Sequence, residues 1–483
     1  MKKTILSAGL LFALLSVNAQ GYQVTLQCPQ FKTGIAYLTY YMGKPLNVLD
    51  SAAVGSNGMA VFKGKTRVPG GIYSIVLPGK RLSTDFLIDK EQKITIRVDT
   101  TDLVNKTVVT GSKEDILFRQ YQKYTAIKGK LLETERRAYI MSTKHADSVL
   151  HENNYNRFNN ELNDYREGII NKNPNSMMTM LLRSMKDPQP PIHRPVTRQD
   201  SIDNFNYYKG HYWDGVSFMD ERVVRTPFFL KRIESYYREV LGPLGADSII
   251  KDIDYKILLA RNAPEMYKFL LNWLTDEYIN PKYMGQDAVF VHLFENYHSK
   301  GLSSWLNKNQ MDIISRRAYM LMANLIGEKA ANLEMLDSHD KPLSLYDLAA
   351  NYTILVFWDP NCGHCKQEVP RLDSIYRASW KNNGVKMFAM LSQDGKMSEK
   401  IKADWLKFIT DNHLEDWTHV YQTNEKEDAD LASQRPGYRQ LYDVTLTPTL
   451  YLLDKDKRII GKRLTWDQLN ELLKVRWKED KKN

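Results

Sequence analysis

Two cysteines separated by two residues, in the sequence Cys-Gly-His-Cys at 362–365, follow a short apolar segment, Ile354–Trp358. A run of β-branched and aromatic residues is typical of a buried strand, and the residues from Lys366 onward predict a helix. The first cysteine then lies at the N-terminus of that helix, where unpaired N–H groups and the helix dipole favour the thiolate. Thiolate is the attacking species in disulfide exchange. The spacing therefore predicts a redox dithiol in which Cys362 attacks and Cys365 resolves the mixed disulfide.

Half of a zinc site is the alternative interpretation of such a cysteine pair. Zinc needs two further ligands at a recognisable spacing, but the chain has only 3 cysteines, and Cys28 is remote from the other two. His413 and His419 do not form a second ligand pair. We therefore expect thiol chemistry with no metal and no cofactor.

Two neighbours of the cysteines have side chains that could tune them. The imidazole of His364 stabilises a thiolate at Cys362, which favours the reduced form and makes the disulfide more oxidising. Glu368 lies one helical turn after Cys365, where a carboxylate could repel the thiolate or accept a proton. The alternative for both residues is an exposed helix position without a role in the chemistry.

The residues around the dithiol resemble the thioredoxin superfamily, and most closely its exported TlpA-like or ResA-like branch. The apolar strand, the dithiol, Pro370 and Thr447-Pro448-Thr449 before the apolar run Leu450–Leu453 occur in the family order. The resemblance covers Gly327 to the C-terminus. It implies a thioredoxin fold and a thiol–disulfide oxidoreductase that acts on envelope proteins with thiols or disulfides, together with a redox partner.

The resemblance also implies roles for individual residues. Pro448 is expected to be a cis proline that faces the dithiol, and Thr447 to offer its backbone and hydroxyl to a bound polypeptide. The partner-binding surface is expected to consist of Trp358, Pro360, Asn361, Gly363 and Thr447. Val356 occupies the position of the buried acid of classic thioredoxins, and this departure gives more weight to Glu368 as the proton carrier.

The direction of electron flow stays open at this point. The ResA-like features favour a reductase, whereas Gly363-His364 favours an oxidase or isomerase. A third interpretation is an envelope ligand-binding protein whose dithiol is secondary.

The N-terminus resembles an export signal. Lys2 and Lys3 precede an apolar segment, Ile5–Leu15, and Val17-Asn18-Ala19 offers a cleavage site with small residues. The apolar segment is too short to span a membrane comfortably, so we expect a protein that does not span the membrane after cleavage and resides in the periplasm or cell envelope. An uncleaved anchor is the alternative. The formal charge of +10, without a nucleic-acid motif, does not indicate nucleic-acid binding.

A chain of 483 residues is long for one core, and its patterns divide it into several domains. We expect a signal peptide at 1–19, an antiparallel β-sandwich at 20–110, a helical region at 111–325 and a thioredoxin-like domain at 326–483. Within the sandwich, Asn57-Gly58 predicts a hairpin turn, and Cys28 is expected to be a buried, inert thiol. The sandwich resembles the β-rich module found before thioredoxin domains in Bacteroidetes envelope proteins.

Overall fold

The computed structural model describes residues 21–43 and 46–481, so the expected signal peptide lies outside the described residues. These residues form two compact units. The first comprises the chain up to Val240 together with 256–269, and the second comprises 241–255 and the residues from Leu270 onward. Within the described ranges, none of the helices is both long enough and apolar enough to cross a membrane.

The first unit begins with two four-stranded sheets packed face to face. One sheet has the order β4-β1-β7-β8, with β1 at Gln23–Gln27, β4 at Met59–Lys63, β7 at Lys93–Arg97 and β8 at Val108–Thr110. The other has the order β3-β2-β5-β6, with β2 at Ile35–Tyr41, β3 at Leu46–Ala53, β5 at Gly71–Val76 and β6 at Ser83–Ile88. Both contribute to one apolar core, which includes Leu26, Leu38, Phe62 and Phe86. The predicted sandwich is confirmed.

Two details of the sandwich differ from the sequence-based expectation. The pairing of β1 with β7 is parallel, so the sandwich is not wholly antiparallel. Asn57-Gly58 connects β3 to β4, but these strands pair with β2 and β1 in different sheets, so the turn does not close a hairpin. Gly58 is required by its φ of 75° and because a Cβ there would lie 2.7 Å from the carbonyl oxygen of Cys28.

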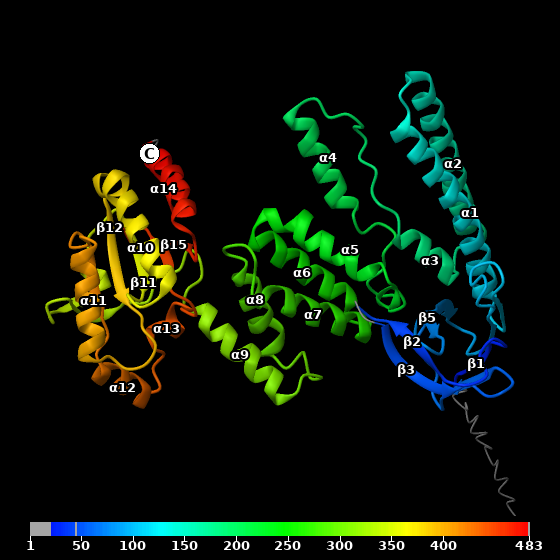
Figure 1. Cartoon of the computed structure of the whole chain (residues 1–483), viewed down its shortest axis with the longest axis horizontal. Helices are drawn as coiled ribbons and strands as arrows, with labels where there is room; N and C mark the ends of the chain where they lie inside the picture. Colours follow the sequence, from blue (N-terminus) through cyan, green and yellow to red (C-terminus); the bar gives the residue numbers. More distant parts are fainter. Residues whose placement is uncertain (1–20, 44–45, 482–483) are drawn as a thin grey trace, which may run out of the picture. The chain divides into compact units, whose positions relative to one another are not determined.

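Helices follow the sandwich, beginning with α1 (Lys113–Met141) and α2 (His145–Lys172), which lie side by side (Figure 1). Helix α1 begins where the sequence predicts, because the Ser112 hydroxyl accepts a hydrogen bond from the Asp115 N–H at 3.2 Å. The later helices are α3 (Met177–Ser184), α4 (Arg198–His211), α5 (Phe229–Ser235), α6 (Ala246–Ala260), α7 (Pro264–Tyr278), α8 (Asp287–Leu293) and α9 (Lys308–Met322).

The C-terminal domain is built on a seven-stranded mixed sheet with the order β10-β9-β13-β12-β11-β14-β15. Its strands are β9 (Glu334–Asp337), β10 (Pro342–Ser344), β11 (Tyr352–Trp358), β12 (Val385–Leu391), β13 (Thr418–Tyr421), β14 (Thr449–Leu453) and β15 (Ile459–Lys462). Its helices are α10 (Gly363–Ile375), α11 (Glu399–Asp411), α12 (Asn424–Ala432), α13 (Tyr438–Leu441) and α14 (Trp466–Asp480). This alternation of strands and helices is the predicted thioredoxin fold.

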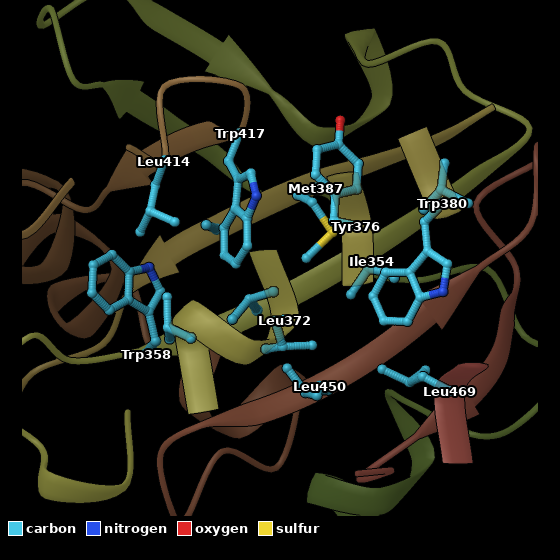
Figure 2. Packing of buried hydrophobic residues seen from close by; sticks show 14 of the residues in the cluster. Ile354, Trp358, Leu372, Tyr376, Trp380, Met387, Leu414, Trp417, Leu450 and Leu469 are labelled. Atoms are coloured by element: carbon cyan, nitrogen blue, oxygen red, sulfur yellow. The ribbon is translucent and has the colours of Figure 1, made fainter. Parts of the chain in front are cut away.

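Strand β11 forms the centre of this domain. All seven of its residues are buried, between parallel β12 and antiparallel β14, as a continuous apolar run predicts for a strand covered on both faces. On one face, Ile354 and Trp358 pack in a cluster that includes Leu372 of α10 and Trp417 (Figure 2). On the other face, Phe357 belongs to a second cluster. The end of β11 therefore holds the following residues at a fixed position.

Candidate functional site

Cys362 is the N-cap of helix α10, directly after the loop that leaves β11. Its φ of −74° and ψ of 126° are extended, and its carbonyl accepts the first helical hydrogen bond from the Lys366 N–H at 3.1 Å. The helix thus begins at Gly363, earlier than the sequence pattern indicates. The Cys362 side chain is half-buried, so its sulfur combines access to solvent with a position at the positive end of the helix.

The surroundings of Cys362 favour its thiolate. Burial alone would raise the pKa of the Cys362 thiol, but hydrogen bonds from the Thr447 hydroxyl and from Cys365 and His364 outweigh it, so the pKa lies below its ordinary value. In the protonated form, the thiol donates to the Thr447 carbonyl at 3.3 Å. Thr447 therefore lies in contact with the Cys362 sulfur.

Cys365 has the opposite environment within the same helical turn. Its side chain is fully buried in the apolar cluster beneath α10, and burial raises the pKa of its thiol to about 12. Its sulfur accepts a hydrogen bond from the Asp359 N–H at 3.5 Å. The pair consists of one accessible, acidic thiol and one protected, weakly acidic thiol.

The loop before β14 lies against the dithiol. The Thr447-Pro448 peptide bond is cis, as predicted, and both residues are half-buried. The sequence interpretation missed Leu446, whose side chain is 76% exposed directly beside Thr447. The sequence could have indicated this residue, because Leu446 is a large apolar residue directly before Thr-Pro-Thr. An exposed leucine next to a reactive sulfur offers a contact to a partner protein.

The expected partner-binding surface needs correction at two positions. Trp358 is fully buried and Pro360 is also buried, so neither contributes an open surface. The Trp358 ring faces the core because it packs against Phe408 of α11, with ring centroids 5.2 Å apart. Asn361, Gly363 and His364 are exposed.

Glu368 lies half-buried on α10 and pairs with Arg371 on the same helix, with Oε1 and Nη1 3.0 Å apart. Its participation in proton transfer stays a prediction. Val356 is fully buried in the cluster that also holds Cys365, so the position of the classic buried acid is apolar here.

Cys28 lies apart from this site, in the first unit. It is fully buried, its thiol donates to Gln30 Oε1 at 3.5 Å, and burial raises its pKa. In the part of the chain that the structure describes, there is no cluster of three or more His, Cys, Asp or Glu side chains that could hold a metal ion.

Two family models match separate parts of the chain. Residues 22–118 match a domain of unknown function, DUF4369, and residues 326–461 match the AhpC/TSA family. A comparison with curated proteins gave no match.

Several solved structures are similar to parts of this chain. A domain of a possible thiol-disulfide isomerase from Cytophaga hutchinsonii is 34% identical, with 33% of this chain and 97% of that chain covered and a TM-score of 0.27. A thioredoxin-like protein from Bacteroides caccae is 21% identical, with 60% and 98% covered and a TM-score of 0.44. The thioredoxin domain of a thiol-disulfide oxidoreductase from Bacteroides vulgatus is 24% identical, with 31% and 96% covered and a TM-score of 0.26.

The AhpC/TSA match extends over the strands and helices that position the site. It includes β11, the dithiol at the start of α10, and the cis Thr447-Pro448 bond before β14. The C-terminal part of this chain is therefore a thioredoxin-like domain whose residues 326–461 match the AhpC/TSA family.

Proposed function

We propose that this protein is an extracytoplasmic thiol–disulfide oxidoreductase that reduces disulfides of envelope proteins through Cys362 and Cys365. One observation carries the proposal: an accessible thiol of lowered pKa lies at a helix N-terminus, and a buried thiol of raised pKa lies one turn behind it. This asymmetry supports attack by Cys362, because only a thiolate that is exposed can reach a protein substrate.

In this proposal, the disulfide exchange proceeds in two steps, attack by Cys362 and resolution by Cys365. The Cys362 thiolate attacks one sulfur of the substrate disulfide, forms a mixed disulfide and releases the other substrate sulfur as a thiolate. Cys365 then loses its proton and attacks the Cys362 sulfur, which releases the second substrate thiolate and leaves the Cys362–Cys365 disulfide. Two electrons pass to the substrate, and a redox partner with a dithiol restores the reduced protein.

Proton transfer at Cys365 is the demanding part of this sequence. Its pKa of about 12 leaves little thiolate at neutral pH, so resolution needs a base. We assign that role to Glu368, one turn further along α10, and assign to His364 the stabilisation of the Cys362 thiolate. Thr447 and Pro448 hold the partner beside the sulfur.

Alkylation of the reduced protein tests the assignment of the two cysteines. Iodoacetamide labelling followed by mass spectrometry should modify Cys362 first, with an apparent pKa below that of free cysteine, about 8.5. Cys365→Ser should keep the rapid reaction and Cys362→Ser should lose it. Preferential labelling of Cys365 would reverse the roles of the two residues.

A disulfide oxidase or isomerase is the second candidate, because the lowered pKa of Cys362 stabilises the reduced form and makes the disulfide more oxidising. The midpoint potential distinguishes the two directions. A value near about −270 mV supports a reductase, whereas a value between about −180 and −120 mV supports an isomerase or oxidase.

A further inference from the structure

A cavity of about 260 Å³ lies beyond the carboxyl ends of β12 and β13. Its walls include Leu391 at the end of β12, Gln422 after β13, Asp430 of α12 and Tyr438 of α13. Crevices beyond the carboxyl ends of the strands are the usual ligand sites of open α/β sheets. The volume is below the range of about 300–1,000 Å³ for drug-sized ligands, so it suits a single side chain.

This cavity is tied directly to the strand that leads to the dithiol. The Tyr438 ring stacks parallel to Phe357 of β11, with an interplanar angle of 3°. Its hydroxyl donates to Ser392 Oγ at 3.1 Å, and the Ser392 N–H donates to the Trp358 carbonyl at 2.8 Å. Leu391 is also the register partner of Trp358 across β11 and β12. The cavity therefore opens one strand away from the end of β11.

The charges in the cavity favour a cation. The lining contains three carboxylates, Asp394, Glu427 and Asp430, and two guanidinium groups, Arg435 and Arg439. Arg439 offsets one of these carboxylates, because its Nη2 lies 3.4 Å from Asp394 Oδ1 and also donates to the Gln393 carbonyl at 2.7 Å, which leaves two carboxylates against Arg435. A local excess of carboxylates is notable in a chain whose formal charge is +10.

Of the two cavity carboxylates that pair with arginine, Asp430 is far less exposed than Asp394. The Asp430 side chain is 15% exposed and accepts from Gln422 Nε2 at 3.3 Å. Its ion-pair partners are Arg435 at 3.0 Å, whose side chain is 63% exposed, and Lys426 at 3.9 Å, whose side chain is 37% exposed. Exposed ion pairs contribute little free energy, so the guanidinium or ammonium group of a ligand can replace Arg435 at Asp430. Arg435 thus occupies the place that a ligand cation would take.

We propose that this cavity binds a lysine or arginine side chain of the polypeptide whose disulfide is exchanged at Cys362. The inference rests on the proposed function and names its substrate class: protein disulfides with a basic residue near the reacting cysteine. Neighbouring strands are about 4.8 Å apart and an extended chain advances about 3.3 Å per residue. The two or three residues between a substrate cysteine and a basic residue can therefore bridge the width of one or two strands, from Cys362 to the cavity.

Matched peptide disulfides test this specificity on the full-length protein. Three peptides with one cysteine, differing only in arginine, glutamine or glutamate three positions away, are linked to thionitrobenzoate through a disulfide. The protein is reduced beforehand and separated from the reductant, so that the Cys362 thiolate attacks the peptide sulfur and releases coloured thionitrobenzoate, and Cys365 then releases the peptide thiol. We expect the second-order rate constant for the arginine peptide to exceed that for the glutamate peptide about fivefold, a ratio that decreases with added salt.

Variants locate the effect at the cavity. Asp430→Asn and, independently, Glu427→Gln should lower the arginine-to-glutamate ratio. Asp428→Asn is the matched control, because this substitution removes the same charge from α12. Asp428 itself pairs with Lys396 and does not line the cavity. It should keep the wild-type ratio. Should Asp430→Asn fail to fold, Glu427→Gln still provides the test.

The outcomes separate the inference from the proposed function. Equal rates for the three peptides, or an unchanged ratio in both cavity variants, would overturn the basic-residue subsite while exchange itself continues. Absence of thionitrobenzoate release from every peptide would instead overturn the proposed exchange activity.

Discussion

Only two residues separate the two cysteines, yet their thiols have opposite properties. The extended backbone at the N-cap places the Cys362 sulfur beside Thr447, where hydrogen bonds lower its pKa against the effect of burial. The first turn of α10 then carries Cys365 into the apolar cluster, where burial raises its pKa. The helix geometry thereby divides attack and resolution between two chemically identical side chains.

Glu368→Gln tests the proton carrier at this scale. The substitution keeps the size of the side chain and removes its titrating group. We expect turnover with a protein disulfide to fall about tenfold or more, because Cys365 then loses its nearest proposed base. The pKa of Cys362, measured by the thiolate absorbance at 240 nm, should decrease, because a nearby negative charge disfavours the thiolate.

Arg371→Gln is the matched substitution, because Arg371 pairs with Glu368. It leaves the carboxylate without its counter-charge, so the pKa of Cys362 should increase. Both variants should unfold close to the wild-type temperature, since surface ion pairs contribute about 0–1 kcal/mol. Unchanged turnover and titration in Glu368→Gln would return this residue to an ordinary helix position.

At the scale of elements, the sequence predicted the strand–dithiol–helix unit because its signals are local. Ile354–Trp358 is a continuous apolar run, and the strand and helix that it implies are both present. The orientation of Trp358 was not predictable in the same way. Strand residues alternate between faces, but which face is covered by α11 depends on the packing of the whole domain.

Other elements could not be predicted from local sequence, because their arrangement depends on contacts between residues that are distant in the chain. Asn57-Gly58 has the local conformation of a tight turn, but the partners of the flanking strands are chosen by the two-sheet core. Helices α12 and α13, which line the cavity, have a weak apolar pattern, since α12 has no buried residue. The cavity they form with Leu391 and Tyr438 therefore left no periodic signal in the sequence.

His419 of β13 makes the stability of the C-terminal domain dependent on pH. Its ring lies among Trp358, Trp405 and Trp417, with centroids 5.9–6.2 Å away, and its Nε2 donates to the Leu414 carbonyl at 2.9 Å. Burial lowers its pKa from 6.5 to about 4. The folded state therefore resists protonation more than the unfolded state, so the contribution is complete above pH 6.5 and is lost as the pH falls toward 4.

The expected loss is on the order of 3 kcal/mol between pH 6.5 and 4. Urea unfolding followed by near-ultraviolet circular dichroism would measure it, since three tryptophans surround the histidine. His419→Phe should reduce the difference in unfolding free energy between the two pH values. His339→Gln, at an exposed position, should leave that difference unchanged. Equal pH dependence of His419→Phe and the wild type would exclude His419 as the source.

At the scale of the whole molecule, the thioredoxin-like sheet shares a buried polar network with the helices that precede it in the second unit. Lys462 of β15 pairs with Asp287 of α8, and its Nζ donates to the carbonyl and the side-chain oxygen of Asn324, both at 2.8 Å. The Lys462 and Asp287 side chains are 7% and 3% exposed. Because buried charges require their partners, these helices stabilise the sheet that carries the site.

Two fragments and one substitution test this dependence. Gly327–Asn483 contains the dithiol and all strands of the sheet but lacks Asp287 and Asn324, whereas Leu241–Asn483 contains them. We expect both fragments to exchange disulfides and the shorter to unfold at lower urea. Lys462→Met should destabilise the longer fragment by about 3 kcal/mol, because Asp287 is left buried without its partner. In the shorter fragment the same change should have little effect, since its Lys462 has already lost those contacts.

Lys457→Met provides the control, because Lys457 Nζ is buried but donates to the Leu348 carbonyl at 2.7 Å and to Thr353 Oγ1 at 2.8 Å. Both partners are present in both fragments, so this substitution should reduce stability equally in the two. A Lys462→Met effect of the same size in both fragments would show that Asp287 and Asn324 do not support the sheet. Loss of exchange in Gly327–Asn483 alone would show instead that the preceding helices are needed to keep Cys362 in its reactive position.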